Sequence, residues 1–175
     1  MIGTKLYPVT QVRTGYGKGQ CTEAAIASLI GCTLEDVPDL WTGAPDGSTE
    51  EEHQPYENRV RLWNWLKREH GVMLCAVRLL ENTEAQAAYD RALQLFVEPK
   101  DAVWAEYHYL VGPNPDGVNH VIVARRGVPV WDPNPSRRGI TAVRWVEWLV
   151  PLHLLPEDVQ TFPAAEWLEP QTAGT

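Results

Sequence analysis

The 175-residue sequence lacks any apolar run near the roughly 18 residues that a membrane-spanning helix needs, and we expect no membrane partner. Residues 1–11 contain no cationic stretch followed by an apolar core, so we expect no signal peptide. Cysteine is scarce: the spacing of Cys21, Cys32 and Cys75 fits neither a disulfide framework nor a zinc site built from cysteine pairs. A low, odd count suits a reducing compartment, and we expect a cytoplasmic protein.

Clusters of basic residues are also absent. The chain has 15 lysines and arginines against 23 acidic residues, a formal net charge of −8, and its densest basic groups are doublets at 125–126 and 137–138. Binding to a nucleic-acid duplex needs clustered positive charge, so we expect no nucleic-acid partner. Hydrophobic residues make up 44% of the chain and charged residues 22%, which is typical of a globular domain.

The length predicts one domain, which we place at residues 1–168, followed by a frayed tail at 169–175. Apolar spacing and helix-ending glycines predict helices at 21–30, 55–70 and about 82–93. Runs rich in β-branched and aromatic residues predict strands at 72–80, 103–111, 118–125, 128–132 and 141–150, with a helix as the less favoured alternative for 141–150. Residues 39–52 are acidic and turn-rich, which predicts an exposed loop. Helices followed by mainly antiparallel strands indicate an α+β domain, with one helix packed on a sheet.

Cys21 is the first residue of a predicted helix of small residues, and a loop with three glycines, Gly15–Gly19, precedes it. A helix N-terminus stabilises a thiolate through its dipole and its free N–H groups. The glycine loop lets the backbone approach a substrate carbonyl, and the Cys21 N–H is itself a candidate donor to an oxyanion. The position therefore predicts a nucleophilic cysteine that needs a base from elsewhere in the chain.

The predicted hairpin supplies that base. With a three-residue loop at 125–127, His120 pairs with Asp132, and paired residues on one face have Cβ atoms within about 5.5 Å of each other. Trp131 then faces away from His120 and into the core. A two-residue loop would put His120 and Asp132 on opposite faces, so the prediction of a His–Asp pair depends on the longer loop.

Three motifs together resemble a known family: Gly19-Gln20-Cys21 at the start of a small-residue helix, then Asn119-His120-Val121-Ile122-Val123, then Asp132-Pro133. They resemble the papain-like cysteine peptidase superfamily, above all its compact bacterial and phage members related to bacteriocin-processing peptidases. The resemblance covers residues 19–38 and 113–136. It implies a papain-like α+β fold and a hydrolase that cleaves an amide or peptide bond of a protein or peptide substrate. It also implies Cys21 as nucleophile, His120 as base, Asp132 orienting the base, and no metal or organic cofactor.

The second oxyanion donor departs from the family pattern. Papain-like enzymes place a glutamine six residues before the cysteine, and Gly15 stands there in this chain. Gln11 is our choice for the donor, because the glycine-rich insert can loop out and return Gln11 to the site. Gln20 is adjacent to the cysteine and is oriented less favourably. Four flanking residues are candidates for substrate-binding or supporting contacts: Gly19, Gln20, Asn119 and Asn134.

Other functions fit the same residues. An acyltransferase or deamidase of transglutaminase type differs only in the acceptor of the acyl group. The altered oxyanion hole suits a catalytically weak binding or effector protein, which in a phage-encoded case would work in the host cytoplasm. A metal bound by Cys21, His120 and Asp132 is a further alternative. Three other side chains are predicted to be structural: Cys32, Cys75 and His108. The sequence predicts neither the substrate nor the oligomeric state.

Overall fold

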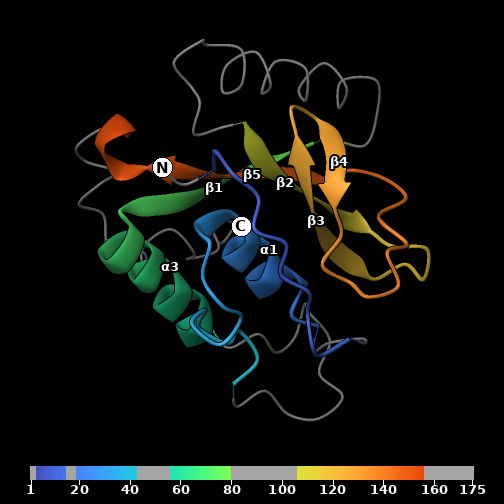
Figure 1. Cartoon of the computed structure of the whole chain (residues 1–175), viewed down its shortest axis with the longest axis horizontal. Coiled ribbons are helices and arrows are strands. Elements are labelled where there is room, and N and C mark those ends of the chain that lie inside the picture. The colour runs from blue at the N-terminus through green and yellow to red at the C-terminus, as the bar shows by residue number, and fades with distance from the viewer. Residues whose placement is uncertain (1–2, 15–18, 43–55, 80–105, 156–175) are drawn as a thin grey trace, which may run out of the picture.

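The computed structural model describes residues 3–14, 19–42, 56–79 and 106–155 (Figure 1). In these residues two α-helices come first and five strands follow. The helices are α1 (Cys21–Ile30) and α3 (Tyr56–His70). The strands are β1 (Val72–Arg78), β2 (Tyr107–Pro113), β3 (Asn119–Arg125), β4 (Val128–Trp131) and β5 (Trp145–Pro151), and a short 3-10 helix, η2 (Leu152–Leu154), follows β5. The prediction of helices followed by antiparallel strands is confirmed.

The five strands form one antiparallel sheet in the order β1-β5-β2-β3-β4. The last strand in sequence, β5, therefore lies between β1 and β2, and β4 is at an edge. Both helices cover the same face, with α1 against β3 and α3 against β1. Residues 141–150 were expected to form a strand, and β5 confirms a strand over most of that range.

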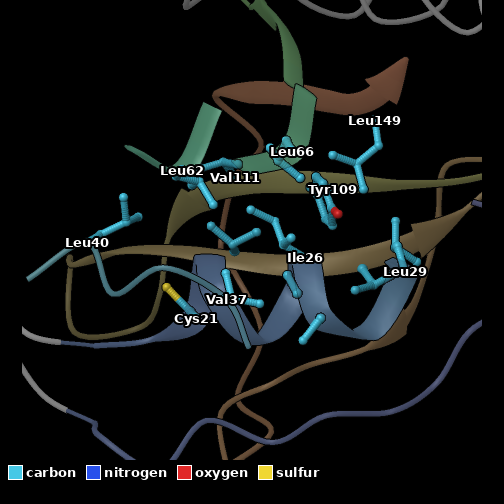
Figure 2. Close-up of a cluster of buried hydrophobic side chains, with 14 of the residues drawn as sticks. Cys21, Ile26, Leu29, Val37, Leu40, Leu62, Leu66, Tyr109, Val111 and Leu149 are labelled. Atoms are coloured by element: carbon cyan, nitrogen blue, oxygen red, sulfur yellow. The ribbon is translucent and has the colours of Figure 1, made fainter. Parts of the chain in front are cut away.

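Side chains alternate between the two faces of the sheet, and each face carries its own apolar cluster. Tyr109 and Leu149 face the helices and pack with Ile26 and Leu29 of α1, as Figure 2 shows. Val146, Trp148 and Val150 of β5 lie on the opposite face. Full burial of such an aliphatic side chain stabilises a fold by about 1.5–3 kcal/mol, so the first cluster holds the two helices on the sheet.

Four of the buried residues of α1 are small, which lets its backbone approach neighbouring elements. Ala24, Ala25 and Ala27 are fully buried, and so is Ser28, whose hydroxyl donates to the Ala24 carbonyl at 2.7 Å and accepts from the Val9 N–H at 2.9 Å. Gly31 then ends the helix with a φ of 84°, a left-handed conformation that glycine adopts without steric cost. The bounds of α1 are those predicted.

The hairpin loop was predicted with three residues and has two. Arg125 pairs with Val128, so only Arg126 and Gly127 form the turn, with φ values of 50° and 82°. Positive φ at both central residues is typical of the two-residue hairpin turns that match strand twist. A two-residue loop would by itself put His120 and Asp132 on opposite faces of the hairpin.

One further prediction is partly wrong, and several others concern residues that the structure does not describe. The acidic loop at 39–52 was expected to be exposed, but Leu40 and Trp41 are about 5% exposed or less, because both pack into the core between the helices. The helix expected at about 82–93, residues 103–105 and the tail at 169–175 lie outside the described residues, as do parts of the domain placed at 1–168.

Within the described ranges, no helix combines the length and the apolar character needed to cross a membrane.

Candidate active site

His120 and Asp132 form a direct pair. Nε2 of His120 lies 2.7 Å from Oδ1 of Asp132, and both side chains are largely buried. The Asp132 carboxylate also accepts the backbone N–H groups of Asn134 and Gly139, each at 2.8 Å. Burial alone would raise the pKa of Asp132, but the hydrogen bonds from His120 and the two N–H groups outweigh it and lower the pKa below its usual value. The carboxylate is therefore charged and held in one orientation.

Cys21 lies on the other side of the same imidazole. Its side chain hydrogen-bonds with His120, and because Nε2 faces Asp132, Nδ1 is the ring nitrogen left for the sulfur. Burial alone would lower the pKa of His120, but the hydrogen bonds with Asp132 and Cys21 raise it to about 9. His120 therefore carries a proton at neutral pH. Cys21 is 8% exposed and His120 5%, so both groups are buried, and Cys21 belongs to the apolar cluster between α1 and the sheet.

A β-bulge makes the His–Asp pair possible despite the short turn. The register shifts between Val123 and Ala124: Ala124 pairs with Pro129, whereas Val123 pairs with Trp131, so Val130 is an extra residue in β4. One inserted residue reverses the alternation of side chains beyond it. Trp131 consequently faces the core with Val123, as predicted, and Asp132 follows on the side of His120.

Gln11 is joined through its backbone to Pro133, the residue that follows Asp132. The Gln11 N–H donates to the carbonyl of Pro133 at 3.0 Å, and its Nε2 donates to the carbonyl of Arg13 at 3.2 Å. Gln20 is bound to Arg13 twice: its N–H donates to the Arg13 carbonyl at 3.3 Å, and its Oε1 accepts the Arg13 N–H at 3.1 Å. The Gln20 side chain is therefore used to join Arg13 to the residue that precedes Cys21.

The other flanking candidates have different environments. Asn134 contributes its backbone N–H to Asp132, while its Oδ1 accepts the N–H of Ser136 in a turn. Asn119 begins β3, and its buried Oδ1 has no hydrogen-bond partner in the described part of the chain. Gly19 is linked through its carbonyl, which accepts Nε1–H of Trp41 at 3.1 Å.

Several polar residues around the site were missed by sequence reasoning. Glu23 is 1% exposed, two positions after Cys21; burial raises its pKa to about 7, although its Oε1 accepts the N–H of Leu40 at 3.1 Å. Asn58 of α3 is also buried. A carboxylate inside a run of alanines was the available signal for Glu23; the roles of Asn58 and Gly139 had no local signal.

Cys32, Cys75 and His108, which we predicted to be structural, lie away from the His120–Asp132 pair in different environments. Burial raises the pKa of Cys32, helped by the negative charge of Asp36, and burial raises the pKa of Cys75. His108 is fully buried, and its ring lies 5.6 Å from that of Trp148. All three cysteines are free thiols.

In the parts of the chain that the structure describes, no three His, Cys, Asp or Glu side chains are arranged to share a metal ion. The meeting of a sulfur, an imidazole and a carboxylate is an arrangement that serves nucleophilic acyl transfer. Neither a protein-family model, nor a curated protein, nor a solved structure matches this chain.

Proposed function

We propose that this protein is a cysteine hydrolase of papain-like design that cleaves an amide or peptide bond in a protein or peptide substrate. The observation that carries the proposal is the continuous contact from Cys21 to His120 to Asp132 at the beginning of α1. A helix covering an antiparallel sheet, with the three residues in this order, supports the papain-like assignment. A reducing compartment such as the cytoplasm would keep the thiol free.

In the proposed reaction Cys21, as a thiolate paired with protonated His120, attacks the carbonyl carbon, and a carbon–sulfur bond forms while the carbonyl π electrons move to the oxygen. The carbon–nitrogen bond breaks as His120 gives its proton to the leaving amine. Water then attacks the thioester, His120 accepts the proton from that water, and the carbon–sulfur bond breaks to release the acid. Asp132 keeps Nε2 engaged, so that Nδ1 exchanges protons with the sulfur, the amine and the water.

Two groups are suited to stabilise the oxyanion. The N–H of Cys21 belongs to the first turn of α1, where amides lack an intrahelical acceptor. Gln11 is our proposed second donor. An amide nitrogen carries two hydrogens, and only one of those on Nε2 is used by the Arg13 carbonyl.

The test uses p-nitrophenyl acetate as an acyl donor. We expect a burst of p-nitrophenolate and a mass increase of one acetyl group on Cys21, both lost in Cys21→Ser and His120→Ala. Cys32→Ser is the matched control and is expected to keep the burst. A burst that persists in Cys21→Ser, with the acetyl group elsewhere, would overturn the proposal. Adding a labelled primary amine then shows whether water or an amine accepts the acyl group.

A further inference from the structure

Residues 39–42 form a short segment, here called the strap, that is anchored to both helices. The N–H of Leu40 donates to Oε1 of Glu23 on α1 at 3.1 Å. Nδ2 of Asn58 on α3 donates to the carbonyls of Leu40 and Thr42, at 3.1 and 2.9 Å. Glu23 and Asn58 are nearly fully buried. Burying polar side chains is favourable only when they are hydrogen-bonded, so these two helices specify where the strap lies.

The strap reaches the residues that lead into Cys21. Nε1–H of Trp41 donates to the carbonyl of Gly19 at 3.1 Å, and Trp41 is 5% exposed. Asp39 accepts the Trp41 N–H at 2.9 Å and forms an ion pair with Arg13 at 2.6 Å. Figure 2 shows Leu40 of the strap at the same end of α1 as the Cys21 sulfur. The strap therefore bridges the two helices and the beginning of the candidate active site.

The peptide unit between Gly19 and Gln20 is held on both sides. Trp41 binds its carbonyl, and the Arg13 carbonyl accepts its N–H. The dihedral angles of Gln20, φ −95° and ψ 29°, connect this unit to the next peptide unit, whose carbonyl accepts the Ala24 N–H at 2.9 Å and whose N–H is that of Cys21. That N–H is the backbone donor of the proposed oxyanion hole.

We propose that Trp41 is a positioning residue: through its hydrogen bond to Gly19 it directs the Cys21 N–H at the oxyanion that forms during acyl transfer. Glu23 and Asn58 act one step further away, because they hold the strap that carries Trp41. This inference rests on the proposed function. It adds a residue that acts through the backbone before Cys21 and not by contacting the substrate or the reacting sulfur.

The test compares two reactions of Cys21 in Trp41→Phe, which keeps an aromatic ring and removes the Nε1–H donor. Acylation by p-nitrophenyl acetate passes through an oxyanion, whereas alkylation by iodoacetamide displaces iodide at a saturated carbon and forms none. We expect acylation to slow about tenfold and alkylation to stay within about twofold of the wild type. Trp63→Phe in α3 is the matched control and should leave both rates unchanged.

A second pair of variants reports on the strap itself. Glu23→Gln keeps an oxygen acceptor for the Leu40 N–H, whereas Glu23→Ala removes it. We expect Glu23→Ala to show the same selective loss of acylation and Glu23→Gln to retain the wild-type rate. The two variants keep the test decisive if Trp41→Phe does not fold.

Three outcomes would overturn the positioning role: wild-type acylation in Trp41→Phe, an equal loss of acylation and alkylation, or an equal loss in both Glu23 variants. Each is distinct from failure of the proposed function, which would appear as acylation that does not depend on Cys21 at all.

Discussion

The two ends of α1 each carry a thiol, and the thiols differ in their partners more than in their burial. Cys21, at the beginning, is the more buried of the two but contacts the imidazole of His120. Cys32, just past the end, is partly exposed, and burial and Asp36 raise its pKa. Exposure alone would have pointed to Cys32 as the reactive residue. Neighbouring groups, rather than exposure, therefore decide which thiol is suited to nucleophilic chemistry.

The two ends also differ in their buried polar groups. Near the end of α1, the Ser28 hydroxyl has both a donor and an acceptor in the backbone. Near the beginning, Glu23 uses Oε1 for Leu40 while its Oε2 has no hydrogen-bond partner among the described residues. Incomplete satisfaction of a buried carboxylate is unfavourable for stability, and such strain is found more often at functional sites than elsewhere.

The largest expected effect separates the two thiols directly. Cys21→Ser should lower the rate of acylation by p-nitrophenyl acetate at least about 10⁴-fold, because the nucleophile is lost, whereas Cys32→Ser should change it less than about twofold. Stopped-flow measurement of p-nitrophenolate release gives both rates. Comparable losses of acylation rate in Cys21→Ser and Cys32→Ser would show that the two thiols do not differ in this reaction.

Asp132→Asn tests the oriented imidazole of His120, which distinguishes the beginning of α1 from its end. We expect acylation to fall about 10³-fold, since an amide does not hold the imidazolium as the carboxylate does. The variant should also lower the pKa of His120 from about 9, so the ring loses its proton at a lower pH. NMR titration of the imidazole, assigned with His120→Gln, measures this change. A pKa that stays near 9 would show that Asp132 is not its cause.

Glu23→Gln tests the buried carboxyl near the beginning of α1 through its effect on stability. The pKa of Glu23 is raised from 4.5 to about 7 in the folded protein, so the folded state binds the proton more tightly than the unfolded chain. The resulting stabilisation is present below pH 4.5 and is lost as the pH rises through about 7. Relative to the wild type, the free energy of unfolding of Glu23→Gln should therefore rise by on the order of 3 kcal/mol between pH 5 and pH 8.

Urea denaturation at the two pH values provides the measurement for Glu23→Gln. Glu57→Gln, on the exposed side of α3, serves as its control and should show no such gain. A pH-independent difference for Glu23→Gln would mean that its carboxyl does not titrate in this range.

The smallest expected effect concerns the hairpin that carries His120. Arg126 has a φ of 50°, a conformation that asparagine adopts more readily than arginine. Arg126→Asn should stabilise the protein by about 0.5–1 kcal/mol. Arg126→Val introduces a β-branched side chain and should destabilise it. Thermal unfolding of the three proteins measures both shifts. Equal melting temperatures would indicate that the turn is not strained.

Local sequence patterns predicted the elements better than the connections between them. The bounds of α1, the end of α3 at Gly71, and the two strands of the hairpin followed from apolar spacing and glycine positions. The hairpin loop was predicted wrongly because arginine rarely adopts a positive φ, so the residue type at position 126 did not indicate a two-residue turn. The bulge at Val123 and Ala124 had no signal either, and it offsets the shorter loop. The His120–Asp132 contact was thus predicted through a register that the protein does not use.

The sequence by itself determined which residues begin and end α1, where the hairpin lies, and which side chains are chemically suited to nucleophile, base and carboxylate. Only the tertiary structure decided that Trp41 binds Gly19 and that Glu23 binds Leu40. These contacts join residues 22 and 17 positions apart. Helix and strand periodicity reflects interactions within a few residues, whereas such contacts form only when α1, α3 and the sheet pack and bring distant backbone together.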